Sequence, residues 1–297
     1  MASIREIKGR IAGIKDTEKI TNAMYLISST KLSRAKNELD RTRPYFRALQ
    51  GEIKRIFRTA PDIDSPYFYP ASGEKPLNGT YGCLVITADK GLAGAYNHNV
   101  LKRAEAMCRD HPDTKLFVVG EFGRHYFAQR NIPIEKSFLY PAMNPTIQRA
   151  REICTNLLER YDAKELEKIY IIYTDMKNSM TAEPMETRLL PFHRGRFAGP
   201  GSEGDGVRFE FTPNLEVILN NVIPSYVTGF VYSALVDSFC SEQDSRMIAM
   251  DAAGENAQEM LEMLSVQYHH VRQAQITKEI TEIASGARAQ RKKRDRG

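Results

Sequence analysis

Residues 88–99, "ADKGLAGAYNHN", come closest in this sequence to a phosphate-binding loop. They follow a predicted strand and precede a predicted helix, which is where backbone amides bind phosphate in many nucleotide-binding proteins. The details do not fit. Lys90 precedes both glycines, the spacing matches neither GxGxxG nor GxxxxGK[ST], and no Ser or Thr follows in the position that binds magnesium. We favour a tight turn at Gly91 and Gly94, with nucleotide binding as the alternative.

Histidine and cysteine offer no stronger candidate for chemistry. The histidines are scattered or, at the one adjacent pair, point to different helix faces, and neither an HExxH nor a Ser-His-Asp arrangement is present. The four cysteines lie far apart without a CxxC pair, which argues against zinc and a disulfide framework and favours a reducing compartment. They are Cys83, Cys108, Cys154 and Cys240. The sequence thus predicts no catalytic residue, no cofactor and no metal.

The elements around the glycine loop predict a central α/β domain. Short β-branched or aromatic runs at 82–88, 115–120 and 168–174 read as strands, and residues 97–109 and 146–161 between them read as helices. This alternation predicts a Rossmann-like βαβ sheet. Segments rich in proline, glycine and serine bracket it at 60–79 and 193–206, so we place the domain at 77–192.

The N-terminal segment, 1–59, predicts a long coiled-coil helix. Ile4, Ile7, Ile11 and Ile14 recur at steps of three and four, and the same steps return from Phe46 to Ile56. Between them we place Ile20, Met24 and Ile27 on the same kind of seam. This placement requires the heptad phase to slip after Ile14 and again before Leu32.

The C-terminal segment, 209–290, predicts a second long helix. Its apolar stripe passes through Ala253, Ala257, Met260, Leu264, Tyr268 and Val271, and then through Ile276, Ile280 and Ile283. From residue 215 to 290 the sequence contains one proline, Pro224, near the beginning. At about 1.5 Å per residue, an unbroken helix here would reach on the order of 100 Å.

Charge favours pairing of the two terminal helices. The net charge of +5 divides unevenly, because residues 1–58 contain 14 Lys and Arg against 6 Asp and Glu, whereas residues 214–290 contain 4 against 10. Either these are two solvated faces, or the segments pair with each other or with charged partners. Together with the stripes, the second possibility predicts an α/β protein with a long antiparallel coiled coil.

Composition excludes several other classes. Apolar residues make up 42% of the 297 residues, an ordinary globular fraction. The longest uncharged apolar run, 222–236, is shorter than the roughly 20 residues of a membrane span, and the N-terminus lacks the features of a signal or transit peptide. Basic and aromatic residues mix at 41–58, but their helical spacing favours a solvated helix face over nucleic-acid binding.

Four ordered motifs resemble the γ subunit family of F-type ATP synthases over nearly the whole chain. They are "ITxAMxLxxxxKLxRA" at 20–35, "GLAGAYN" at 91–97, "SEQxxRMxAMxAAxENA" at 241–257 and "RQAxITxEIxEIxxGA" at 272–287. The resemblance, to the bacterial type, implies the central rotor shaft of the F1 sector. Such a subunit performs no chemistry itself but couples ion-driven rotation of the c ring to ATP synthesis or hydrolysis at the α/β catalytic sites.

The resemblance also implies partners and contact residues. The partners would be a hexamer of alternating α and β subunits, the ε subunit and the c ring, peripheral to the cytoplasmic face of the cell membrane. Arg272, Gln273 and Thr277 match positions that contact a loop of β, and Met24 matches an apolar shaft position. Phe211 falls in the segment that resembles the foot on the c ring.

Two features depart from the family or leave alternatives open. The basic tail, residues 291–297, extends past the usual end of the family, and its crowded positive charges predict a solvated, disordered segment. It is a passive extension, a contact with the hexamer crown or a brake on rotation. Rival classes for the whole chain are a structural coiled-coil scaffold and a nucleotide-binding regulator.

Overall fold

The computed structural model describes residues 3–59, 65–69, 79–176, 183–193, 212 and 214–294. It contains two compact units, one comprising Met1–Ile27 with Ile248–Gly297 and the other Ser28–Met247. Helices α1 (Ile4–Thr59) and α5 (Leu215–Arg294) contribute residues to both units. The expected class, an α/β domain with long N- and C-terminal helices, is confirmed.

The second unit is built on a four-stranded sheet in the order β2-β1-β3-β4. The strands are β1 (Tyr81–Ile86), β2 (Thr114–Val119), β3 (Lys168–Thr174) and β4 (Pro184–Leu190). Strand β1 pairs in parallel with both β2 and β3, and β4 pairs antiparallel with β3. The order therefore reverses between β1 and β3, as in doubly wound folds.

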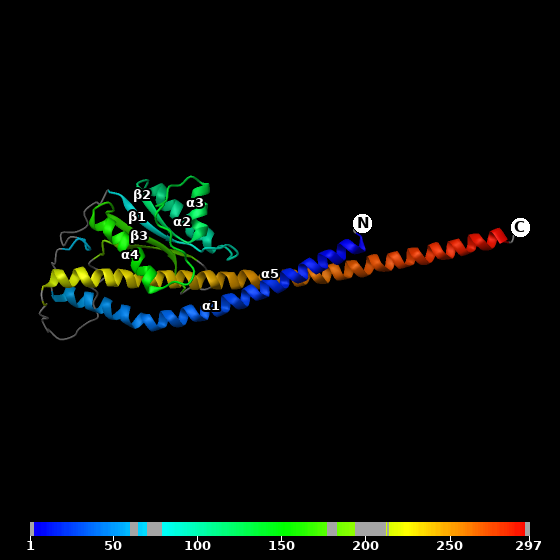
Figure 1. Cartoon of the computed structure of the whole chain (residues 1–297), viewed down its shortest axis with the longest axis horizontal. Coiled ribbons are helices and arrows are strands. Elements are labelled where there is room, and N and C mark those ends of the chain that lie inside the picture. Colours follow the sequence, from blue (N-terminus) through cyan, green and yellow to red (C-terminus); the bar gives the residue numbers. More distant parts are fainter. Residues whose placement is uncertain are drawn as a thin grey trace. The chain divides into compact units, whose positions relative to one another are not determined.

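Helices cover both faces of this sheet (Figure 1). They are α2 (Tyr96–Asp110), α3 (Glu121–Gln129) and α4 (Ile147–Asp162). Strand β1 divides its side chains between two cores: Cys83 and Val85 pack with α2 and α3, whereas Leu84 and Ile86 pack with α4 and with parts of α1 and α5. Burial on both faces explains why the parallel strands read as continuous apolar runs.

In the second unit, α1 and α5 approach closely enough to need a glycine. The Phe46 ring lies 6.2 Å from the Tyr232 ring, and a methyl group added at Gly229 would overlap Phe46. A residue without a side chain therefore admits the aromatic ring of the neighbouring helix.

In the first unit, the ends of α1 and α5 pair antiparallel. The Lys8 Nζ atom lies 5.5 Å from the centre of the Tyr268 ring, and a methyl group added at Gly254 would lie 3.8 Å from the Thr21 hydroxyl oxygen. Moving forward along α1 from Lys8 to Thr21 thus moves backward along α5. The expected antiparallel pairing is confirmed, with Ile7 buried in the seam.

The predicted phase slips in α1 are wrong. Ile20 is 60% exposed and Ile27 54% exposed, whereas Thr21 is buried and Glu18 is half-buried. The buried seam runs on at steps of three and four because each step of one residue turns a helix by about 100°, which places Ile20 on another face. A threonine can be buried in this seam because the Thr21 hydroxyl donates a hydrogen bond to the Glu18 carbonyl oxygen at 2.9 Å.

Two further expectations need correction. Met260 is exposed, and the adjacent Leu261 is half-buried in its place. Helix α5 extends to Arg294, so residues 291–294 are helical rather than disordered, and basic residues are favourable at a helix C-terminus because they oppose its dipole. Residues 295–297 lie outside the described residues. Helix α3 and strand β4 were not anticipated from the sequence.

Candidate functional site

The glycine loop after β1 is a turn braced by its own side chains. Asn97 accepts a hydrogen bond from the Ala88 amide at 2.9 Å and donates to the Lys90 carbonyl oxygen at 3.3 Å. Leu92 and Gly94 both have positive φ, at 62° and 53°. The left-handed conformation explains Gly94, because most side chains disfavour it. The loop therefore makes the tight turn favoured from the sequence.

The carboxylate of Asp89 occupies the position beside this loop where backbone amides could bind an anion. Its carboxylate accepts hydrogen bonds from the amides of Glu121, Ala142 and Met143 at 3.1, 3.0 and 2.8 Å. Glu121 is the first residue of α3, and the N-terminus of a helix attracts negative charge. Amides that could have held a phosphate therefore hold a side chain of the protein itself.

Helix α5 fills the crevice outside the carboxyl ends of β1 and β3. Doubly wound sheets bind their ligands at this topological switch point. Here Ser238 accepts a hydrogen bond from the Thr174 amide at 3.2 Å, at the end of β3. Arg246 donates to the Gly91 carbonyl oxygen at 3.1 Å, in the loop after β1. The arrangement disfavours nucleotide binding because α5 stands where the ligand would lie.

The cysteines are poorly suited to nucleophilic or metal chemistry. Cys83, Cys154 and Cys240 are buried, and burial raises the pKa of each thiol, to about 12 for Cys154 and Cys240. Half-buried Cys108 also has a raised pKa because of desolvation. Since the thiolate is the reactive form, these residues react slowly near neutral pH. Among the described residues, no three His, Cys, Asp or Glu side chains cluster as metal ligands.

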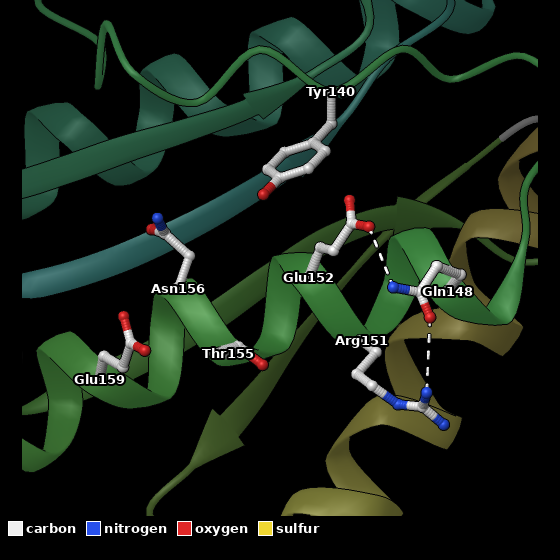
Figure 2. A pocket seen from close by; sticks show the side chains of 7 residues that line it. All are labelled: Tyr140, Gln148, Arg151, Glu152, Thr155, Asn156 and Glu159. Atoms are coloured by element: carbon white, nitrogen blue, oxygen red, sulfur yellow. Dashed lines mark hydrogen bonds between the residues drawn. The ribbon is translucent and has the colours of Figure 1, made fainter.

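Two of the grooves on the second unit are considered as candidate sites. Figure 2 shows the smaller, about 340 Å³, along the polar face of α4, with Gln148 donating to Glu152 at 3.1 Å and accepting from Arg151 at 3.4 Å. None of the charged residues that line this groove is buried. The larger, about 680 Å³, lies between α1, α5 and the loop before α4, over the apolar side chains of Tyr232 and Phe239. Neither groove gathers a set of catalytic side chains.

The structure brings together three of the five predicted contact residues. Arg272, Gln273 and Thr277 are all exposed near the C-terminal end of α5, past its contact with Lys8. Met24 is half-buried on α1 and is not part of this group. Phe211, the predicted foot residue, lies outside the described residues.

An apolar row accompanies these three residues. Ile276, Ile280 and Ile283 are 44, 61 and 73% exposed. Exposed apolar residues at steps of four and three form one stripe on a helix, and such stripes mark surfaces that partners cover. The sequence identified this row, whereas the exposed Ile20 and Ile27 were missed because their spacing resembled that of a buried seam.

No helix in the described part of the chain combines the length and apolar character needed to cross a lipid bilayer.

Comparison with known proteins supplies independent findings. A protein-family model described as ATP synthase matches residues 3–290. The chain is 38% identical to the ATP synthase gamma chain of Acetivibrio thermocellus over 295 residues, covering 97% of this chain and 99% of that protein. It is also 38% identical to the ATP synthase gamma chain of Caldanaerobacter subterraneus subsp. tengcongensis, covering 95% and 98%.

Solved structures show the same fold at low sequence identity. A chain of the Euglena gracilis mitochondrial ATP synthase, in its OSCP/F1/c-ring structure, matches with a TM-score of 0.65 and 16% identity over 96% of this chain and 94% of that one. A chain of the Tetrahymena thermophila mitochondrial ATP synthase central stalk and c ring matches with a TM-score of 0.56 and 21% identity, over 79% and 99%.

Proposed function

The chain belongs to the ATP synthase γ-chain family, and on this premise we propose that it is the central rotor shaft of an F1Fo ATP synthase. In this role it couples rotation of an ion-driven c ring to ATP synthesis or hydrolysis by α and β subunits. The chain itself performs no catalysis. Three observations support this part of the proposal: helix α5 fills the crevice at the switch point, the Asp89 carboxylate occupies the anion position, and the pKa values of the thiols are raised.

The exposed isoleucine row of α5 carries the proposal. Ile276, Ile280 and Ile283 form an apolar row of their own at steps of four and three, and all three are exposed in the isolated chain. Solvent exposure of such a row is unfavourable, at about 25 cal/mol per Å² of apolar surface. A sleeve formed by a hexamer of α and β subunits would cover it.

The polar residues beside this row would transmit force. The planar guanidinium of Arg272 suits a bidentate contact with a carboxylate or carbonyl group of β, and Gln273 and Thr277 offer further hydrogen bonds. Met24 would contact the hexamer as part of the apolar surface of α1. Toward the membrane, the ε subunit and the c ring would contact the α/β domain, with Phe211 in the foot.

This role places the protein at the cytoplasmic face of the cell membrane, as a peripheral subunit. Attachment through the c ring requires no membrane-spanning helix in this chain. The family relationship supports that position, because the γ chain of an ATP synthase belongs to a membrane-associated complex.

Reconstitution tests the proposal. The purified chain is mixed with α and β subunits, and ATPase activity and rotation of a probe attached to the chain are measured. We expect an active assembly in which the probe rotates during hydrolysis. Binding of ATP by the isolated chain at micromolar concentrations, with no active assembly, would instead support a nucleotide-binding regulator.

A variant of the shaft end tests the contact residues. Arg272→Ala with Gln273→Ala should lower ATP synthesis, because both side chains would meet β during rotation. Exposed polar residues contribute little to folding, so the free energy of unfolding should change by less than about 0.5 kcal/mol. A large loss of stability with normal synthesis would assign these residues to the fold instead.

A further inference from the structure

Buried polar residues concentrate in one short stretch of α5. Within nine residues, this helix buries Ser238, Ser241, Glu242, Gln243 and Arg246. Glu242 and Arg246 are the two charged residues that are buried among those whose burial is described. Because a charge removed from water is costly unless it is paired, this stretch requires a structural or functional reason.

Arg246 joins two partners through the fixed geometry of its guanidinium. One nitrogen, Nη1, donates to Glu242 Oε1 at 2.6 Å, and the other, Nη2, donates to the Gly91 carbonyl oxygen at 3.1 Å. The side chains are 10% and 4% exposed for Arg246 and Glu242. The pair therefore binds α5 to the loop after β1 in a largely water-free environment.

A second set of contacts fixes the same face of α5 to β3. The Thr174 amide donates to Ser238 Oγ at 3.2 Å, and Ser241 Oγ donates to the Thr174 carbonyl oxygen at 3.5 Å. Ser238 also hydrogen-bonds to buried Tyr96, at the start of α2. These polar contacts connect α5 to the carboxyl ends of both central strands.

Hydrogen bonds and ion pairs are directional, so they can fix the orientation of a helix in a way that apolar packing cannot. Burial of Phe239 and Val236 of α5 resists separation from the sheet, but the hydrophobic effect is non-directional and tolerates sliding and rolling. A buried ion pair adds little net stability compared with apolar residues of the same volume, yet it can specify one register. The Arg246 pair thus sets the angular position of α5 against the sheet.

We infer that Arg246, with Glu242, is the positioning residue that transmits turning force between the α/β domain and helix α5. The inference rests on the proposed rotor function. From Arg246 the chain continues as one unbroken helix to Arg294, so a rotation applied at the loop after β1 is carried into α5. The Gly91 carbonyl and the Thr174 backbone are the points where the sheet holds the helix.

The test replaces both charges with unbranched apolar side chains. Glu242→Met with Arg246→Met leaves no stranded buried charge, so the domain should fold and assemble. The variant is reconstituted into the complete membrane complex, and the ratio of ATP-driven ion pumping to ATP hydrolysis is measured for protons and for sodium. We expect near-normal hydrolysis with a ratio lowered by at least about fivefold, the low end of ordinary coupling between sites.

A matched control removes an ion pair that does not touch α5. Arg103 of α2 pairs with Glu186 of β4 at 2.7 Å, and Arg103→Met with Glu186→Met should leave the ratio unchanged. Arg246→Lys provides a second variant if the double variant fails to assemble. Lysine keeps the charge beside Glu242 but lacks the rigid fork that also reaches Gly91, so its ratio should be lowered.

The outcomes separate this inference from the proposed function. If the wild-type chain forms no rotating ATPase, the rotor function itself fails. If the wild type rotates and the double variant retains the wild-type ratio, the positioning role of Arg246 is wrong. An unchanged ratio in Arg246→Lys contradicts the role in the same way when the double variant cannot be assembled.

Discussion

The two compact units bury their side chains to very different extents. In the first unit, the buried residues among those described are Ile7, Thr21, Met250 and Ala257, arranged along one seam. In the second, both faces of the sheet carry cores, and side chains such as Leu84 and Phe117 are fully buried. The first unit thus has the surface expected of a part that partners cover, and the second that of an independent core.

The largest contrast should come from removing one leucine from each unit. Leu84→Ala leaves a cavity in a two-sided core and should destabilise the second unit by about 2–5 kcal/mol. Leu264→Ala should destabilise the first unit by less, because Leu264 is only half-buried on an open seam. Native-state hydrogen exchange, resolved by unit, measures both. Equal losses would show that the first unit is as tightly packed as the second.

Two glycines of α5 should respond with opposite signs. At Gly229 an added methyl overlaps Phe46, so Gly229→Ala should destabilise the second unit by about 1–3 kcal/mol. At Gly254 the methyl would make an ordinary contact, so Gly254→Ala should stabilise the first unit by about 0.5–1 kcal/mol through helix propensity.

Thermal unfolding of the two variants, followed by circular dichroism, measures these shifts. The pair serves as its own control because both substitutions are Gly→Ala within one helix. A stabilising Gly229→Ala would mean that Phe46 moves aside at little cost, and that the close approach of α1 and α5 in the second unit is not required.

The buried pair of the second unit should make stability depend on pH. Burial raises the pKa of Glu242, and the Arg246 guanidinium opposes that rise. In Arg246→Met the pKa should rise further. A carboxyl whose folded pKa is raised favours the folded state at low pH, so stability should fall as pH rises above the ordinary pKa of a glutamate, by about 1.4 kcal/mol for each unit of pKa difference crossed.

Urea unfolding at several pH values measures this slope. The double variant Glu242→Met with Arg246→Met is the control, because it has no carboxyl at this position and should lose the added dependence. A slope of opposite sign in Arg246→Met would place the pKa of Glu242 below its ordinary value and contradict the desolvated environment of the pair.

The smallest effect on stability is expected at the free end of the first unit. Ile280→Ser with Ile283→Ser changes side chains that are exposed in the isolated chain, so the free energy of unfolding should stay within about 0.5 kcal/mol. Assembly with α and β subunits, measured by size-exclusion chromatography, should weaken. Unchanged assembly would show that α and β subunits do not need this isoleucine row, and the rotor proposal would lose its main support.

Residue patterns alone predicted much of this protein. Continuous β-branched runs predicted β1, β2 and β3 because strands buried on both faces leave few polar positions. Strand β4 was missed because Glu186, Thr187 and Arg188 interrupt its apolar character at the edge of the sheet. Helix α3 was missed because it has nine residues and contains Gly123. The contacts expected of Arg272 came from the family motif rather than from periodicity, and they stay a prediction.

The seam and the loop depended on tertiary structure. Ile20 and Thr21 differ by one position, and hydrophobicity favours the isoleucine, but the face turned toward α5 is set by the whole helix pair and contains Thr21. Likewise, the glycines after β1 predicted a turn. Only the structure shows that the Asp89 carboxylate binds backbone amides beside this turn and that Arg246 binds the Gly91 carbonyl oxygen. Local periodicity determines which elements form, because it reflects the repeat of the backbone. Which groups meet depends on contacts between residues more than a hundred positions apart, such as Gly91 and Arg246, and only the packed fold brings these together.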